Sequence, residues 1–163
     1  MQKDTVTVRF VGRVRTRLLA EEIRADARDL DAIIEIFPEY QEALDGLEGF
    51  SHIFVLNYFD KLRPDQIGPL KVRPRRLLRY GVRLEDLPLL GVFALDSPTR
   101  PNPIGITLVK LIRIERNLLH VQGLDLFDGT PILDIKPYRS NYRPDNFEIP
   151  EWDLKLLRLT GQK

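Results

Sequence analysis

The chain has 163 residues, about the size of one domain and long enough to bury a single hydrophobic core. It contains no cysteine, which excludes disulfides and thiolate metal sites, and no apolar run approaches the roughly 20 residues that span a bilayer. The formal net charge of +1 is too small to indicate nucleic-acid binding through bulk charge. Because the N-terminal residues lead into no apolar secretion signal, we expect one cytoplasmic, non-membrane domain spanning residues 1–163.

The first element is predicted to be a strand, because apolar or small residues occupy alternate positions and so share one face. These positions are Val6, Val8, Phe10, Gly12 and Val14. A short helix is expected over residues 38–44, since Pro38 suits the first helical position and Gly46 follows the end.

Short apolar or alternating runs continue along the rest of the chain. They cover residues 32–37, 52–59, 90–95, 104–114, 118–124, 131–136 and 154–159. Several strands at this spacing, without long intervening helices, favour an antiparallel barrel or sandwich. In the longest run, one strand face is predicted to hold Ile104, Ile106, Leu108, Ile112 and Ile114. The four prolines between residues 60 and 88 indicate a long excursion from this β structure.

Six cations without an intervening carboxylate follow in that excursion. They are Lys71, Arg73, Arg75, Arg76, Arg79 and Arg83. Such a stretch is either a solvated surface or a set of phosphate ligands whose affinity depends on salt.

The segment 96–105 carries three prolines in six residues directly before the longest run. Proline fixes its own φ and biases the preceding residue towards extended geometry, so Arg100 and Asn102 are predicted to be held rigidly. A guanidinium and an amide held in this way suit an oriented contact to a carboxylate, phosphate or base edge. A stiff barrel corner explains the same pattern.

Residues 123–138 carry several charges between apolar runs. Asp128-Gly129 predicts a tight hairpin turn. Asp125, Asp134 and Lys136 interrupt apolar strands and therefore need partners, although Asp134 with Lys136 also fits a surface ion pair.

The two histidines point to no metal centre. His52 begins an apolar run and His120 lies within one, which is typical of structural histidines. With no cysteine to join them, they argue against a zinc site.

Four blocks of sequence, taken in order, resemble the TsaA/TrmO-like family of tRNA methyltransferases. They are residues 46–52, 91–94, 97–105 and 125–138. The resemblance implies a mainly β fold, a small antiparallel β-barrel with few short helices, working as a homodimer. It further implies that S-adenosylmethionine binds near the subunit interface. Its methyl group is implied to pass to N6 of threonylcarbamoyl-adenosine beside the tRNA anticodon.

The resemblance also implies roles for individual residues. Cofactor binding falls on Asp60, Lys61, Asp96, Ile106, Asp125, Leu126, Phe127, Asp128, Gly129 and Thr130. The catalytic candidates are Arg100, Asn102 and Asp134. Substrate or RNA contacts fall on Arg73, Arg75, Arg76, Arg79, Arg100, Lys136 and Tyr138. No resident metal is implied.

Three departures from the family pattern keep other hypotheses open. Asp60 stands where histidine is common, Asp96 stands where arginine is common, and residues 19–31 are acidic in place of a cofactor-binding segment. One alternative is therefore a barrel that binds the cofactor or RNA without turnover. Another is a methyltransferase for a different RNA base or a small molecule.

Overall fold

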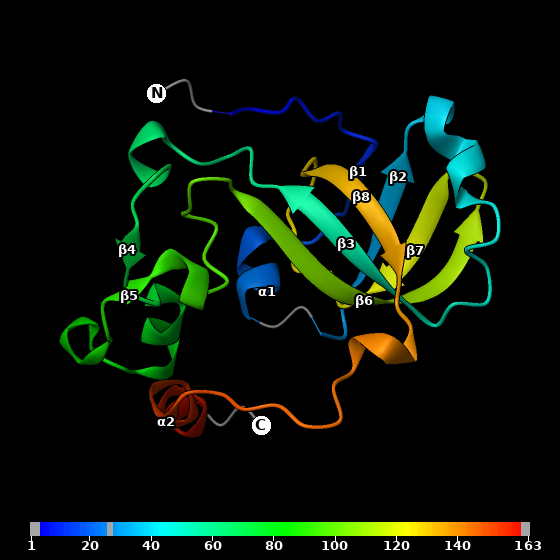
Figure 1. Cartoon of the computed structure of the whole chain (residues 1–163). Helices are drawn as coiled ribbons and strands as arrows, with labels where there is room; N and C mark the ends of the chain where they lie inside the picture. Colours follow the sequence, from blue (N-terminus) through cyan, green and yellow to red (C-terminus); the bar gives the residue numbers. More distant parts are fainter. Residues whose placement is uncertain (1–3, 26–27, 161–163) are drawn as a thin grey trace. The chain divides into compact units, whose positions relative to one another are not determined.

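A computed structural model describes residues 4–25 and 28–160 of the chain (Figure 1). The chain forms two compact units, which we call the barrel unit (Met1–Lys61 and Ile104–Arg139) and the second unit (Leu62–Pro103 and Ser140–Lys163). The expectation that both belong to one domain stays a prediction. Among the described residues, no helix has the length and apolar character needed to cross a membrane.

Six antiparallel strands close the barrel, which confirms the predicted fold class. Around the barrel they follow the order β1-β2-β7-β6-β3-β8, and β8 pairs back with β1. In that order their bounds are Gly12–Arg15, Asp31–Ile36, Leu118–Gln122, Ile104–Glu115, His52–Tyr58 and Pro131–Pro137. Among the described residues of this unit, closure leaves no long unpaired strand edge.

The interior is filled by the alternate residues of each strand, as the period of two requires. Fully buried examples are Val14, Ile34, Ile53, Leu119 and Ile132. Two helices accompany the barrel, α1 (Ala20–Ala25) and the 3₁₀ helix η1 (Pro38–Leu44). The second confirms the predicted short helix with proline at its start.

The predicted first strand is shorter than its pattern indicated. Val6, Val8 and Phe10 are exposed and lie outside any strand, and β1 begins only at Gly12. The amide of Phe37 donates to the carbonyl of Val11, after which Pro38 starts η1. Residues before Val11 therefore have no continuing β2 partner, so the alternation there does not form a strand.

The long strand β6 carries two apolar faces. Val109 and Leu111 point inward, whereas Ile104, Ile106 and Leu108 point outward with 40, 63 and 45% of their surface exposed. A register shift between Leu111 and Arg113 turns Ile114 back towards the core. The prediction that all five isoleucine and leucine positions share one face was therefore wrong for Ile114, which follows the register shift.

The second unit is built from short pieces. It holds a two-stranded sheet of β4 (Lys71–Val72) and β5 (Leu90–Gly91) and the helix α2 (Glu151–Thr160). Its 3₁₀ helices are η2 (Pro64–Gln66), η3 (Arg75–Tyr80), η4 (Leu84–Asp86), η5 (Val92–Ala94) and η6 (Ser140–Tyr142).

Two apolar runs of this unit were wrongly grouped with the strands. Residues 90–95 form only a two-residue strand and then η5, and residues 154–159 belong to α2. The amides of Asp153 and Leu154 both donate to the carbonyl of Pro150, which starts the helix. Leu156, four residues after Trp152, is buried, and this spacing of apolar residues is helical.

Candidate functional site

The segment 123–130 crosses one end of the barrel. Asp128 and Gly129 form the predicted tight turn, with Gly129 at φ 79° and the Thr130 amide donating to the Phe127 carbonyl at 3.1 Å. The predicted hairpin was wrong, because β7 pairs with β2 and β6 while β8 pairs with β1 and β3. Because β7 and β8 lie on opposite sides of the barrel, the segment that connects them crosses one end of the barrel. There Leu124 and Leu126 are buried in the core.

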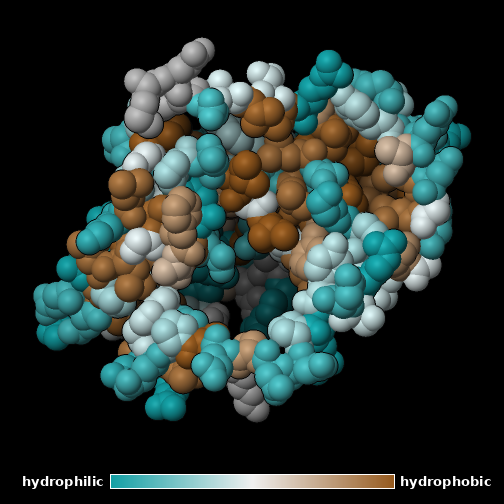
Figure 2. All heavy atoms as spheres, viewed as in Figure 1, coloured by the Kyte–Doolittle hydropathy of each residue, from teal (hydrophilic) through white to brown (hydrophobic). Residues whose placement is uncertain are grey.

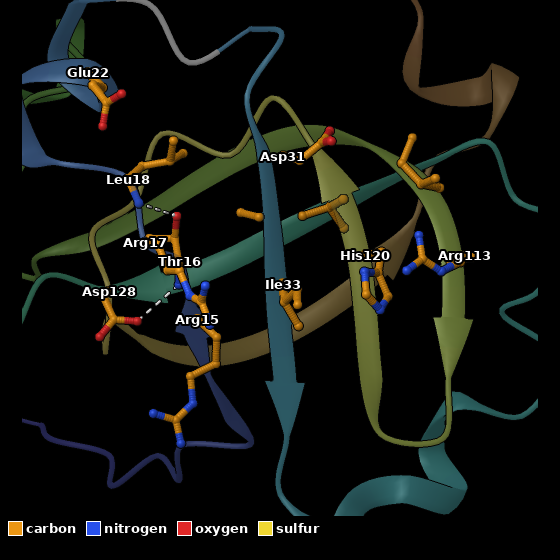
Figure 3. Close-up of a pocket in the computed structure, with 13 residues that line it drawn as sticks. Arg15, Thr16, Arg17, Leu18, Glu22, Asp31, Ile33, Arg113, His120 and Asp128 are labelled. Atoms are coloured by element: carbon orange, nitrogen blue, oxygen red, sulfur yellow. Dashed lines mark hydrogen bonds between the residues drawn. The ribbon is translucent and has the colours of Figure 1, made fainter.

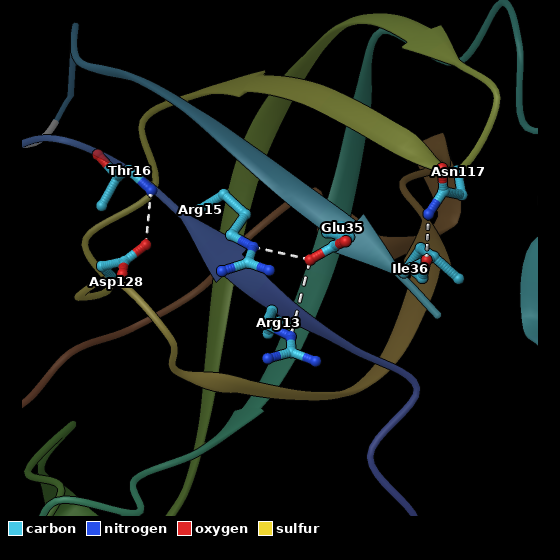
Figure 4. A network of polar contacts seen from close by, with 7 residues as sticks. All are labelled: Arg13, Arg15, Thr16, Glu35, Ile36, Asn117 and Asp128. Carbon is cyan, nitrogen blue, oxygen red and sulfur yellow. Dashed lines mark hydrogen bonds and ion pairs between the residues drawn. The ribbon is translucent and has the colours of Figure 1, made fainter. Parts of the chain in front are cut away.

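Asp128 joins two other strand ends to this turn. Its carboxylate accepts a hydrogen bond from the backbone amide of Thr16 at 3.0 Å, just after β1 (Figure 4). Its carbonyl accepts one from the Lys61 ammonium at 2.7 Å, shortly after β3. The fold thus brings together two of the predicted cofactor residues that lie 67 positions apart.

Other predicted cofactor residues lie on the same segment or beside it. The Asp125 carboxylate accepts a hydrogen bond from the Thr107 hydroxyl at 3.0 Å, next to Ile106 on β6. The Arg24 guanidinium of α1 lies 5.2 Å from the ring centre of Phe127. Asp60 is exposed directly after β3. Asp96 belongs instead to the second unit, so the structure groups it with a different set of residues.

Asp128 lines a cavity of about 720 Å³ in the barrel unit (Figure 3). Among the described residues that line it, the other nine predicted cofactor residues are not found. Its wall includes the whole segment Arg15–Leu18, which the sequence interpretation did not assign. The available signal was a pair of arginines flanking a threonine directly after the first strand. Of residues 19–31, treated as a departure from the family pattern, Glu22 and Asp31 also line it, while 26 and 27 lie outside the described residues.

Most charges around this cavity are already paired. Glu35 binds Arg15 at 2.7 Å and lies 3.7 Å from Arg13 (Figure 4). Arg113 lies 2.6 Å from Glu115, and its hydrogen bond lowers the pKa of that carboxyl. The Glu22 carboxylate accepts a hydrogen bond from the backbone amide of Leu19 at 2.6 Å.

Two lining charges have no such partner. Within the part of the chain that the structure describes, neither Arg17 nor Asp31 forms an ion pair. Ile33 and Ile112 add apolar wall between them and the other polar groups. A free cation, a free carboxylate and an apolar wall suit a ligand that combines a carboxylate, an amine or hydroxyls, and a flat ring.

The predicted catalytic residues are not among those that line this cavity. Arg100 donates to the carbonyls of Ser97 at 2.9 Å, Val92 at 2.9 Å and Leu95, so it anchors its own loop in the second unit. Asn102 is exposed in the same loop. On β8, Asp134 and Lys136 form an ion pair at 2.6 Å, as the pattern allowed.

The remaining RNA candidates fall on both units. Arg73, Arg75, Arg76 and Arg79 lie in or beside η3 of the second unit. Tyr138 of the barrel unit packs edge-on against His52 and Phe54, with ring centres 6.5 and 5.6 Å away. The structural role expected for His52 stays a prediction.

Residues 24–143 match the family model of the tRNA-methyltransferase O N-terminal domain. The chain belongs to this family. The match covers the strands β2 to β8 and the Asp128 turn, which confirms the family resemblance drawn from the sequence blocks.

Relatives in the tRNA-methyltransferase O family differ in length and in name. A probable S-adenosyl-L-methionine-binding protein of Pyrococcus abyssi is 37% identical over 79% of this chain and 58% of its own length. One of the same description from Methanothermobacter thermautotrophicus is 42% identical over 85% of this chain and 93% of its own. The human tRNA (adenine(37)-N6)-methyltransferase is 41% identical in a region that covers 74% of this chain and 26% of that enzyme.

Solved structures carry the same fold. A crystal structure of TrmO superposes with a TM-score of 0.67 at 33% identity, covering 89% of this chain and 64% of the other. TrmO from Pseudomonas aeruginosa gives 0.63 at 32% identity, covering 85% of this chain and 58% of the other. The chain therefore spans about three fifths of those proteins.

Proposed function

We propose that this protein is an S-adenosylmethionine-dependent methyltransferase that modifies N6 of an adenosine, or threonylcarbamoyl-adenosine, beside the tRNA anticodon. The observation that carries the proposal is the Asp128 turn inside a tRNA-methyltransferase O fold. Lys61 and Thr16 both bond to Asp128, and Asp128 and Thr16 line a cavity of about 720 Å³. The human relative is named for this same reaction. A tRNA substrate also fits the cytoplasmic location expected from the sequence.

The residues at this cavity fit the cofactor. S-adenosylmethionine has a carboxylate, an ammonium, a ribose diol and an adenine ring. Arg17 is the free cation for the carboxylate, while Asp31 and Asp128 offer oxygens to the ammonium or the ribose hydroxyls. Ile33 and Ile112 supply apolar surface for the adenine, and the volume lies in the usual range for small-molecule sites, about 300–1,000 Å³.

Bound S-adenosylmethionine supplies an activated methyl group on a sulfonium, which an amine can attack directly. The work left for the protein is orientation more than proton abstraction. Lys61 and Thr16 hold the Asp128 turn in one conformation, and Thr107 orients the Asp125 carboxylate beside it. A site organised before the ligand arrives loses less entropy on binding.

The RNA contacts are proposed for the cations of the second unit, with Lys136 and Tyr138 of the barrel unit as further candidates. Arg75 and Arg76 are exposed and suited to phosphates. Arg100 is assigned a positioning role, because its three carbonyl contacts hold the 92–103 loop that presents Asn102. Asp134 is half-buried beside Lys136 and stays a catalytic candidate.

The homodimer is proposed to form through the outer face of β3 and β6. On this face Phe54, Leu56 and Tyr58 stand opposite Leu108, Ile106 and Ile104, respectively. Figure 2 shows hydrophobic side chains gathered over these strands. Contiguous exposed apolar surface of this kind marks an association site, and a second copy of the chain would cover it.

Charge on the β6 face tests the dimer. Leu108→Lys should convert the protein to a monomer, because it buries a charge in the apolar contact. Phe147→Lys replaces an exposed apolar residue of the second unit and serves as control. Analytical ultracentrifugation should find monomers for the first variant and dimers for the second; a monomeric wild type contradicts the dimer.

One observation favours the alternative of a cofactor-binding protein without turnover. The archaeal relatives from Pyrococcus abyssi and Methanothermobacter thermautotrophicus are named only for binding S-adenosylmethionine. Binding and transfer therefore need separate measurements.

Calorimetric titration with S-adenosylmethionine and S-adenosylhomocysteine tests the binding site first. Asp128→Ala removes a carboxylate that lines the cavity, and Asp125→Ala removes one on the same segment that does not line it. Each should weaken binding about tenfold or more, as expected for loss of a charge-assisted contact. The control Asp45→Ala changes an exposed carboxylate of the same unit that lies outside both the cavity and the segment 123–130. Unchanged affinity in both site variants would overturn the cofactor assignment.

Transfer is measured with radiolabelled cofactor and two tRNA preparations, one carrying threonylcarbamoyl-adenosine and one unmodified. Label at N6 of the adenosine beside the anticodon supports the proposal, and the more active preparation identifies the acceptor. Tight cofactor binding without label in either tRNA supports the binding module instead.

A further inference from the structure

The second unit contains a cavity of its own, of about 780 Å³. Its walls come from parts of the segment 63–77, from Leu89 and residues 95–99, and from one face of α2. The cavity is polar at one wall and aromatic at another. None of the cofactor residues proposed above line it, apart from Asp96.

The polar wall carries an excess of positive charge. Five cationic and three acidic side chains line the cavity. Arg63 is matched by Asp65 at 3.1 Å, and Arg73 donates to the backbone carbonyl of Leu87. Lys71, Arg75 and Arg76 are exposed and form no ion pair with any residue in the described ranges 4–25 and 28–160. Three such cations around one cavity suit phosphate groups.

The other wall is one face of the first two turns of α2. Trp152 and Leu156 are one helical turn apart, and both line the cavity. Leu156 is buried, which fixes the orientation of the helix face, while Trp152 is only half-buried. A half-buried indole beside unpaired cations is the arrangement that single-stranded nucleic-acid sites use, with bases stacked on aromatic rings and phosphates on cations.

We propose that this cavity binds a nucleotide of single-stranded RNA, with the base stacked on Trp152 and the flanking phosphates on Lys71, Arg75 and Arg76. The inference rests on the proposed tRNA function and specifies which part of the RNA this unit takes. Only an unpaired nucleotide can offer its face to the indole, so a loop or a strand end binds and a continuous duplex does not.

Trp152 is the only tryptophan of the chain, so its fluorescence reports on this cavity alone. Titration with a single-stranded RNA pentamer should quench the emission, since a stacked base contacts the ring directly. A hairpin duplex of the same composition should not quench it. Inorganic phosphate should displace the pentamer only weakly. If phosphate displaces the pentamer at a concentration equal to that of the RNA, the cavity binds anions in general, and the proposal is overturned.

Variants test separately how each wall contributes to RNA affinity, which is measured by the fluorescence anisotropy of a fluorescein-labelled pentamer. Trp152→Ala should weaken binding about tenfold or more, and Trp152→Phe should restore most of it. Arg75→Gln with Arg76→Gln should weaken binding and make its dependence on salt less steep. The matched control is Arg158→Gln, an exposed cation of α2 outside the cavity. Wild-type affinity in the Trp152→Ala protein, with its fold verified by circular dichroism, would overturn the proposal.

Two outcomes distinguish this inference from the proposed function. RNA that quenches Trp152 while tRNA receives no methyl group leaves the nucleotide site standing and rejects the methyltransferase. Methyl transfer to tRNA with an unchanged KM in Trp152→Ala keeps the enzyme and rejects the nucleotide site.

Discussion

The interactions that stabilise the barrel unit internally differ from those that stabilise the second unit. In the barrel, strand ladders enclose side chains such as Ile34 and Leu119 that are completely buried. In the second unit, arginine side chains tie separate loops together: Arg73 donates to the Leu87 carbonyl and Arg100 to three others. One chain thus combines a core stabilised by apolar burial with loops stabilised by charged donors on backbone carbonyls.

The largest expected difference comes from shortening one leucine in each unit. Leu119→Ala removes a side chain with 0% exposure and should lower the free energy of unfolding by about 3 kcal/mol. Leu84→Ala changes a residue that is 43% exposed and should cost about 0.5 kcal/mol or less. Urea denaturation measures both.

Equal losses in the two variants would contradict the assignment of Leu119 to a buried core and of Leu84 to the exposed surface. The same curves also test the predicted single domain. One transition seen alike by Trp152 fluorescence in the second unit and by far-UV circular dichroism supports it, and two separate transitions reject it.

Close packing inside the barrel makes a glycine necessary at one position. A Cβ added to Gly105 would lie 2.7 Å from Cζ of Phe59 and also against the Asn57 amide, which is fully buried. Gly105→Ala should therefore destabilise the protein by about 2 kcal/mol. Gly91→Ala is the matched control in the second unit, since its Cβ would meet only the Leu70 carbonyl, at 4.0 Å. Thermal unfolding of both should show a loss in the first variant alone.

A middle-sized effect is expected when a loop of the second unit loses its anchor. Arg100→Gln removes charged donors from the carbonyls of Ser97, Val92 and Leu95 and should cost about 1.5 kcal/mol. Hydrogen exchange of residues 92–103 should accelerate while barrel strands stay protected. Arg143→Gln, an exposed arginine of the same unit, should leave the exchange unchanged. Faster exchange spread equally over both units would contradict a local anchoring role.

The smallest effect concerns surface charge on the barrel. The hydrogen bond from Arg113 lowers the pKa of Glu115, so the folded state binds this proton less readily than the unfolded state. The resulting stabilisation is present above the ordinary carboxyl pKa and is lost as pH falls through the lowered value. Glu115→Gln should thus unfold slightly more easily than wild type at pH 7, and the two should converge on acidification. Because the side chain is exposed to solvent, added salt should reduce the difference. A difference that grows towards low pH would contradict this account.

Predictions from sequence succeeded where a local pattern has one structural solution. Alternating residues at 32–37 and 118–124 became strands β2 and β7, and Pro38 began a short helix. The same rule was wrong at Val6 and Val8, because a strand also needs a neighbour to pair with and β2 ends before reaching them. It was wrong at residues 154–159 as well. These residues lie in the helix α2, whose first hydrogen bonds are accepted by the carbonyl of Pro150.

The candidate site shows the same division. The sequence by itself determined the mainly β fold, the Asp128-Gly129 turn and the family, because these depend on residue types at short spacing. Only the tertiary structure decided that Lys61 meets Asp128 and that Arg15–Leu18 lines the cavity. It also decided that Trp152 faces the same cavity as Arg75 and Arg76. Those contacts join segments far apart in the chain, and which distant segments meet depends on how the whole chain packs, which no local pattern encodes.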